Sequence, residues 1–296
     1  MTICNTIGPV ELKKRRRSVD MDRETITAIG RQELVINIRN RWTLIFAIVF
    51  AALVVGVSYF GMMAEGFAGL QNFTRTSTSL LNLILYIVPL VSLVMGTLSF
   101  TGDKGSTELL FSQPLTRSEV LLGKLLGVFA SITLSMLFGF ALAGIIVLFA
   151  AGTDGLLRYV FLVAISIALA FVFLSLAVLS STMAKRKVKA FGVSIFLWFF
   201  FVLFYDLVAL GGTLLFSGPS SNVFLFLSLF GNPVDMVRVS TLIVLNNATI
   251  FGAAGAALMR FFGGGAVSMA LLFVGLAMWG IVPLFVSHRL LARQDI

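Results

Sequence analysis

Long apolar stretches alternate with short polar ones along most of the chain. Six of them are long enough to cross about 30 Å of hydrocarbon as helices, which takes roughly 20 residues each. They cover residues 42–61, 80–100, 125–150, 158–182, 190–216 and 266–287. Another apolar stretch, residues 221–262, is interrupted by asparagine, proline and glycine. We expect it to lie on the outer surface or to dip into the membrane. The fold class predicted is an all-α polytopic membrane protein with six transmembrane helices.

The placement of basic residues predicts the orientation of these helices. With the N-terminus in the cytoplasm, 18 of the 22 Lys and Arg residues fall on the cytoplasmic side. Such an excess is typical of cytoplasmic loops. We therefore expect both termini in the cytoplasm and the protein in the inner membrane. We expect residues 1–22, which include the basic run Lys13–Arg17, to form a disordered cytosolic tail. We expect residues 42–296 to form the six-span domain.

The segment 23–41 shows the spacing of an amphipathic helix. Ile29, Leu34 and Ile38 recur at helical intervals before Trp42, so we expect an interfacial helix that turns into the first span. A solvated extension of that span is the alternative. The residues of this elbow helix and its end that we single out are Arg31, Glu33, Arg39, Arg41 and Trp42.

The composition excludes several classes of function. Hydrophobic residues make up 58% of the chain and charged residues 12%, with a net charge of +9. A basic chain can bind nucleic acid, but here the charges follow the membrane orientation pattern. With one cysteine and one histidine, the chain has no disulfide, no CxxC motif and no predicted metal site. The stretch Gly102–Thr107 lacks the residue order of a phosphate-binding loop, so we expect a non-catalytic chain without a bound cofactor.

The polar loop 102–124 carries an unusual number of signals for local structure. Ser106-Thr107-Glu108 is typical of a helix start, and Pro114 ends that helix. Thr116 and Glu119 then predict a capping box that begins the third span. The apolar side chains between them could rest on the membrane or dock on a soluble partner, and both remain open. The candidate coupling residues are Gly105, Ser106, Thr107, Glu108, Leu109, Leu110, Pro114, Leu115, Arg117 and Glu119.

The third span contains a small residue at every fourth position. Such a ridge lets another helix approach closely, and static packing is a simpler expectation than a sliding interface. The ridge consists of Gly123, Gly127, Ser131, Ser135, Gly139 and Ala143.

Two polar groups stand out near the predicted outer surface. Asp206, next to Tyr205, is the one acid within a span, and acids there are functional candidates. Asp206 lies about 25 Å along the helix from Lys189 on the cytoplasmic side, which places it close to the outer membrane interface. It could be a hydrogen-bonded acid at that interface or line a transport path, and both roles remain open. Asn232, Pro233 and Asp235 are typical of a helix start. With Arg238, this helix is either a local fold element or a contact for an outer partner.

The loop and the two ends of the chain resemble a known family. The signature loop of ABC-2-type permeases resembles residues 105–110, 112–115, 117–119 and 122–125 of this chain. The family's elbow helix is similar to residues 31–34 and 39–42, and its basic C-terminal tail to residues 289–296. The resemblance implies a homodimer joined to two cytosolic ATPase subunits, which bind the ATP and magnesium. It also implies that residues 102–119 hold a coupling helix that enters the ATPase cleft.

A narrower resemblance rests on residues 197–208 and 231–238. They look like NosY-like permeases, whose transporters mature the copper site of nitrous-oxide reductase. This resemblance implies an extracytoplasmic β-helical partner, and a permease that transmits motion to it. The alternatives are an ABC-2 exporter of another cargo (a drug, ion or lipid), an ion-coupled secondary transporter that uses Asp206, and a membrane scaffold without a cargo path.

Overall fold

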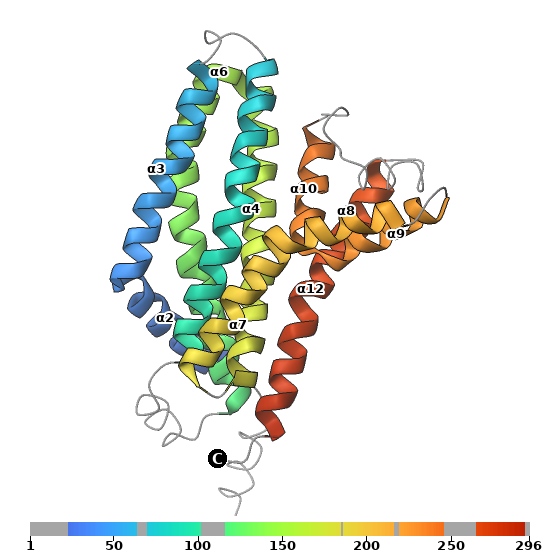
Figure 1. Ribbon diagram of the computed structural model, residues 1–296. Coiled ribbons are helices and arrows are strands. Elements are labelled where there is room, and N and C mark those ends of the chain that lie inside the picture. Colours follow the sequence, from blue (N-terminus) through green and yellow to red (C-terminus); the bar gives the residue numbers. More distant parts are fainter. Residues whose placement is uncertain are drawn as a thin grey trace, which may run out of the picture.

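The computed structural model describes residues 23–63, 70–101, 116–184, 186–215, 219–245 and 265–293, and these parts are almost entirely helical (Figure 1). No strand occurs within them. Six helices are long and apolar enough to cross a membrane: Arg41–Gly61, Thr76–Phe100, Arg117–Phe149, Gly155–Ala184, Lys187–Gly212 and Ala266–Ala292. The predicted all-α fold with six candidate spans is therefore confirmed.

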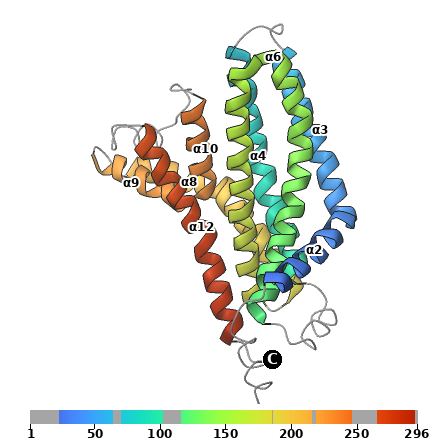
Figure 2. The same cartoon turned by 180° about the vertical axis from the view of Figure 1, so that it is seen from behind.

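The helices form an upright bundle with a side arm (Figures 1 and 2). Helices α3, α4 and α6 run the length of the bundle, α2 crosses its base, and α8 and α9 project to one side. Helix α6 is a hairpin that contains two of the spans. The elements are α2 (Arg23–Arg39), α3 (Arg41–Met63), α4 (Leu70–Phe100), α6 (Arg117–Ala184), α7 (Lys187–Phe199), a π-helix (Phe200–Phe204), α8 (Tyr205–Leu215), α9 (Pro219–Gly231), α10 (Pro233–Val244) and α12 (Gly265–Arg293).

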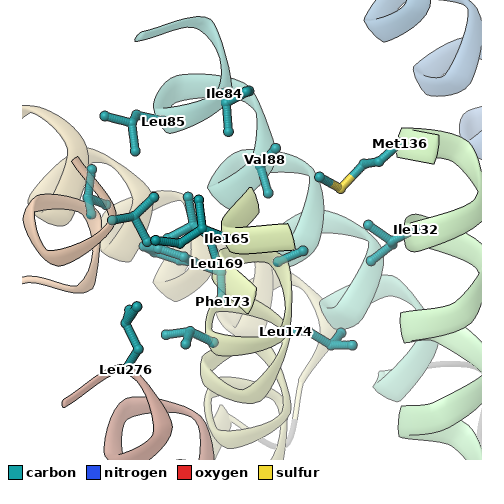
Figure 3. Close-up of a cluster of buried hydrophobic side chains, with 14 of the residues drawn as sticks. Ile84, Leu85, Val88, Ile132, Met136, Ile165, Leu169, Phe173, Leu174 and Leu276 are labelled. Carbon is teal, nitrogen blue, oxygen red and sulfur yellow. The ribbon is translucent and has the colours of Figure 1, made fainter. Parts of the chain in front are cut away.

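The hydrophobic core lies between α4 and the two arms of α6. In Figure 3, Met136 of the first arm extends toward Val88 of α4. Phe173 of the second arm lies next to Leu169 and packs edge-on against Phe201, at 6.1 Å between ring centroids. In the most apolar part of Gly155–Ala184, 67% of the residues are buried, against 17% for Lys187–Gly212. The fourth span is therefore the central helix, whereas the fifth leaves most of its apolar surface uncovered.

The small-residue ridge of the third span packs against two helices of the same chain. A Cβ atom on Gly127 would lie 2.5 Å from the Gly30 carbonyl oxygen and 2.6 Å from the Glu33 Cβ of α2. A Cβ on Gly139 would lie 3.0 Å from the Ala51 Cα of α3. The close approach predicted from the sequence is confirmed, and its partners are α2 near the base and α3 further along.

The contact between α2 and α6 should be sensitive to a single methyl group. We expect Gly127→Ala to lower stability by about 1–3 kcal/mol, because the added Cβ would overlap backbone atoms of α2. Gly56→Ala in α3 is the matched control, since a Cβ added there would have no neighbouring atom within 4 Å. Thermal unfolding in detergent measures both, and equal midpoints for the two variants would contradict the packing described.

Candidate functional site

Two groups of polar residues are the candidate functional sites, one at the base of the bundle and one beside the arm. The first surrounds residues 102–115, which connect α4 to α6 and carry most of the predicted coupling residues. Gly105, Ser106, Thr107, Glu108, Leu109, Leu110, Pro114 and Leu115 lie outside the described residues. Arg117 and Glu119 are described, and they belong to the first turn of α6.

The capping box predicted at the start of α6 is confirmed. The Thr116 backbone N–H donates to Glu119 Oε2 at 2.8 Å, and the Glu119 N–H donates to Thr116 Oγ1 at 3.3 Å. Reciprocal bonds of this kind satisfy amides that have no partner within the helix. Glu119 is only 5% exposed. Its carboxylate therefore fixes where α6 begins.

The same turn of α6 is fastened to the C-terminal end of α12. Arg117 Nη1 donates to the Leu291 carbonyl oxygen at 2.5 Å, which satisfies a carbonyl in the last turn of α12. Ser118 Oγ lies 2.8 Å from His288 Nε2, within hydrogen-bond distance. His288 is the single histidine of the chain, and no local pattern in the sequence indicates this neighbour 170 positions away.

The end of α4 is fastened to both α6 and α2. Lys124 Nζ donates to the Ser99 carbonyl oxygen at 3.0 Å and lies 5.9 Å from the centre of the Phe100 ring. The Ser99 hydroxyl donates to the Glu33 carboxylate of α2. Asn37 Nδ2 also donates to Glu33, to its Oε1 at 3.1 Å. Helices α2, α4, α6 and α12 are thus joined by hydrogen bonds where α4 ends and α6 begins, and we call this hydrogen-bonded assembly the loop frame.

The elbow helix contributes unequally to this frame. Its side against the bundle carries Gly30, Glu33 and the buried Asn37, whereas Arg31, Arg39, Arg41 and Trp42 are exposed. Trp42 lies in the first turn of α3, where its backbone N–H donates to Asn40 Oδ1 at 3.0 Å. The apolar spacing in the sequence indicated a helix here, but not that a carboxylate and an amide would face the bundle.

The second site brings together two groups of residues that lie apart in the sequence. Arg238 Nη1 donates to Asp235 Oδ1 at 2.7 Å and to Asp206 Oδ2 at 3.1 Å. Asp206 belongs to α8 and the other two belong to α10. We call Tyr205, Asp206, Asn232, Asp235 and Arg238 the Arg238 cluster. It ties the end of the fifth span to the helix pair that follows.

Asn232 is the buried centre of this cluster. Its Oδ1 accepts the Val234 N–H at 3.0 Å, which confirms the predicted N-cap of α10, with Pro233 in the first turn. Its Nδ2 donates to Asp235 Oδ2 at 2.9 Å and to the Phe201 carbonyl oxygen at 3.0 Å. One fully buried amide thus connects α10 to the fifth span.

The fifth span is irregular where Asn232 meets it. Residues Phe200–Phe204 form a π-helix, a local widening of the helix that frequently occurs at functional sites. Helices α9 and α10 are bent by 108° at Asn232, so they form a broken span or a re-entrant pair. Tyr205 connects α8 to α9, because its hydroxyl donates to the Ser228 carbonyl oxygen of α9 at 2.8 Å. The aromatic run Leu197–Tyr205 contains neither glycine nor proline to signal this irregularity.

The Arg238 cluster has an inner and an outer side. Side-chain exposure is 42% for Asp206 and 30% for Arg238, but only 15% for Asp235. Asp206 and Arg238 therefore present the accessible charge, while Asp235 and Asn232 serve the internal structure. Within the described residues no group of three His, Cys, Asp or Glu side chains could hold a metal ion.

The fold and these sites define a polytopic helical membrane protein whose polar residues join helices to one another. A family model described as ABC-2 family transporter protein matches residues 27–296. A protein of Pseudomonas aeruginosa named "Probable ABC transporter permease protein NosY" is 34% identical over 277 residues, covering 92% of this chain and 99% of that protein. A protein of the same name from Stutzerimonas stutzeri is 34% identical over 275 residues, covering 90% and 97%.

The chain belongs to the ABC-2 transporter family. Its relatives are permeases, and the similarity to the NosY permeases extends over nine-tenths of the chain. It is therefore the membrane component of an ABC transporter, in which ATP is hydrolysed by a separate subunit.

Two substitutions at Asn232 separate its roles. We expect Asn232→Ala to destabilise the protein by about 1–3 kcal/mol, because the cap and two donated hydrogen bonds are lost. Asn232→Asp keeps a cap acceptor but turns a second carboxylate toward Asp235. We expect it to be at least as damaging, as measured by unfolding in detergent. A wild-type midpoint for Asn232→Asp would show that capping alone matters.

Proposed function

We propose that this chain is the inner-membrane subunit through which a separate cytosolic ATPase drives movement of membrane helices. It acts as a homodimer that carries two ATPase subunits, and residues 102–119 are the docking element for the ATPase. The observation that carries this proposal is the loop frame. The end of α4 and the start of α6, which flank the loop, are each hydrogen-bonded to other helices, so that a force delivered at either end would reach several helices at once.

The contacts of the frame explain how a force on the loop would spread. The Lys124–Ser99 bond connects α6 to α4, the Glu33–Ser99 bond adds α2, and the Arg117–Leu291 bond adds α12. Close-packed interiors transmit displacement rather than absorb it, and the glycine contacts of α2 with α6 leave little free space. A loop that merely connected two spans would need none of these hydrogen bonds between helices.

The distribution of charge supports a cytoplasmic position for the frame. Arg23 at the start of α2, Arg117, Lys189 and Arg289 belong to segments that converge on the base of the bundle in Figure 1. Basic residues accumulate on the cytoplasmic side of membrane proteins. The frame thus lies on the side where a cytosolic ATPase would bind.

Helix α12 offers a route from the frame to the arm. Near one end it holds His288 and Leu291 against α6. Nine residues before His288, or about 14 Å of helix, Trp279 Nε1 donates to the Phe230 carbonyl oxygen of α9 at 3.0 Å. The Trp279 ring also packs edge-on against Phe201, at 5.3 Å between centroids. A displacement of α12 would therefore reach α9 and the π-helix next to the Arg238 cluster.

The NosY resemblance suggests the purpose of this movement. We propose that it acts on an extracytoplasmic partner, of the β-helical type that the resemblance implies, in maturation of the copper site of nitrous-oxide reductase. Asp206 and Arg238 are the exposed charges of the arm that such a partner could contact. The pairing of Asp206 with Arg238 gives this carboxylate a structural partner, which favours the ATPase-driven function over ion-coupled transport.

The loop should be required for coupling. We expect Glu108→Lys and Leu110→Asp to abolish most ATP-driven activity of the assembled transporter without unfolding the permease, because both change the proposed docking surface. Glu24→Lys is the matched control, since it makes the same charge change on an exposed position of α2. ATPase activity and co-purification of the ATPase subunit are the measurements. Unchanged coupling in both loop variants would refute the docking role.

The route through α12 makes a second prediction. We expect Trp279→Phe to reduce ATP-dependent movement of the arm, because the bond to Phe230 is lost while an aromatic ring remains. The reporter is the alkylation rate of Leu227→Cys, an exposed α9 position, in a Cys4→Ser background with and without ATP.

Trp198→Phe is the control for this experiment. It removes an indole hydrogen bond of similar length, 2.9 Å to the Tyr86 carbonyl oxygen, outside the α12 route. An equal loss of the ATP effect in both tryptophan variants would argue against α12 as the route.

A further inference from the structure

The turn between α6 and α7 borders a cavity to which neither the permease function nor the Arg238 cluster assigns a role. Helix α6 ends at Ala184 and α7 begins at Lys187. An open cavity of about 550 Å³ lies against this turn. It is lined by Ser180, Met183, Ala184, Arg186, Lys189 and Val193. Because the turn joins two membrane spans, the cavity lies at the depth where lipid headgroups meet the protein.

One wall of the cavity is cationic and uncompensated. Within the described parts of the chain, neither Arg186 nor Lys189 forms an ion pair with a carboxylate. Arg186 is also the N-cap residue of α7, and its side chain makes no capping bond. The positive end of a helix dipole disfavours nearby cations. An anion between these side chains would relieve this repulsion.

The cavity lining also includes accessible apolar side chains. The exposed fractions of Met183 and Val193 are 66% and 42%, large values for apolar side chains beside a cavity. Ser180 adds no free donor, because its hydroxyl donates to the Ala177 carbonyl oxygen at 2.9 Å and lies 3.1 Å from Ser194 Oγ. Cationic and apolar walls in one cavity suit a ligand that is itself part anionic and part apolar.

We infer that this cavity binds an anionic phospholipid, with the phosphate between Arg186 and Lys189 and the first acyl methylenes against Met183 and Val193. Basic pockets between transmembrane helices are recurrent sites for anionic headgroups. A free phosphate ion would neutralise the cations but leave the apolar wall uncovered. The volume is large for a single phosphate and has room for a glycerophosphate headgroup.

The alternative explanation is a diffuse attraction of the basic turn to the membrane surface. Lys187 distinguishes the two, because it belongs to the same turn and is exposed but does not line the cavity. Diffuse attraction depends on the number of charges, so that loss of Lys187 and loss of Lys189 would be equivalent. A defined site depends on which charges are lost.

The test is native mass spectrometry of the full chain, titrated in detergent with dioleoylphosphatidylglycerol or dioleoylphosphatidylcholine. We expect Lys189→Gln alone to weaken phosphatidylglycerol binding about threefold or more, and Arg186→Gln with Lys189→Gln about tenfold or more. Lys187→Gln should change it less than about twofold, and phosphatidylcholine binding should be the same in all variants. The charge-conserving pair Arg186→Lys with Lys189→Arg should retain most of the binding, which controls for misfolding.

Three results would overturn the inference. Equal weakening by Lys187→Gln and by Lys189→Gln would indicate diffuse attraction, and wild-type binding by the double glutamine variant would place the lipid elsewhere. Full competition by inorganic phosphate at the lipid's concentration would indicate a free-anion site. The titration does not involve the ATPase, so failure of the coupling experiments would leave its result unaffected.

Discussion

Within the hydrocarbon of a membrane, a polar group has no water with which to pair, and this constraint shapes every part of the molecule. It requires helices for the spans, and it directs serine hydroxyls such as Ser135 and Ser166 back onto the carbonyl four residues earlier. It also explains why the larger polar side chains join helices. Asn232 and Arg238 can be accommodated in the arm only because each finds partners on a neighbouring element.

The hydrogen bonds and ion pairs between helices fall into two groups, which join different parts of the molecule. At the base of the bundle, the loop frame fastens α2, α4, α6 and α12 around the connection that we propose as the ATPase docking element. In the arm, the Arg238 cluster fastens the irregular fifth span to the bent pair α9 and α10. Trp279 of α12 lies between the two groups and contacts Phe201 and Phe230. Direct contacts through α12 therefore connect the loop frame to the Arg238 cluster, so that a displacement of the frame could reach the cluster.

The sequence predicted what depends on neighbours in the chain. Span length, the Thr116–Glu119 capping box and the Asn232 cap all follow from residues at most a few positions apart. It could not predict contacts without a local periodicity. Asp206 and Arg238 were both singled out, but as separate features, because they are 32 positions apart in the chain and no periodicity links them. The docking of α2 on α6 was missed for the same reason, although the small-residue ridge indicated that some helix must approach.

The central claim is that the connection between α4 and α6 is where the ATPase meets the membrane subunit. Photo-crosslinking tests it most directly, with benzoylphenylalanine replacing Phe111 in that connection or Phe60 near the opposite end of α3, where the side chain is 71% exposed. The account predicts a crosslink to the ATPase subunit from position 111 and none from position 60. A crosslink from position 60, or none from position 111 in an intact complex, would contradict it.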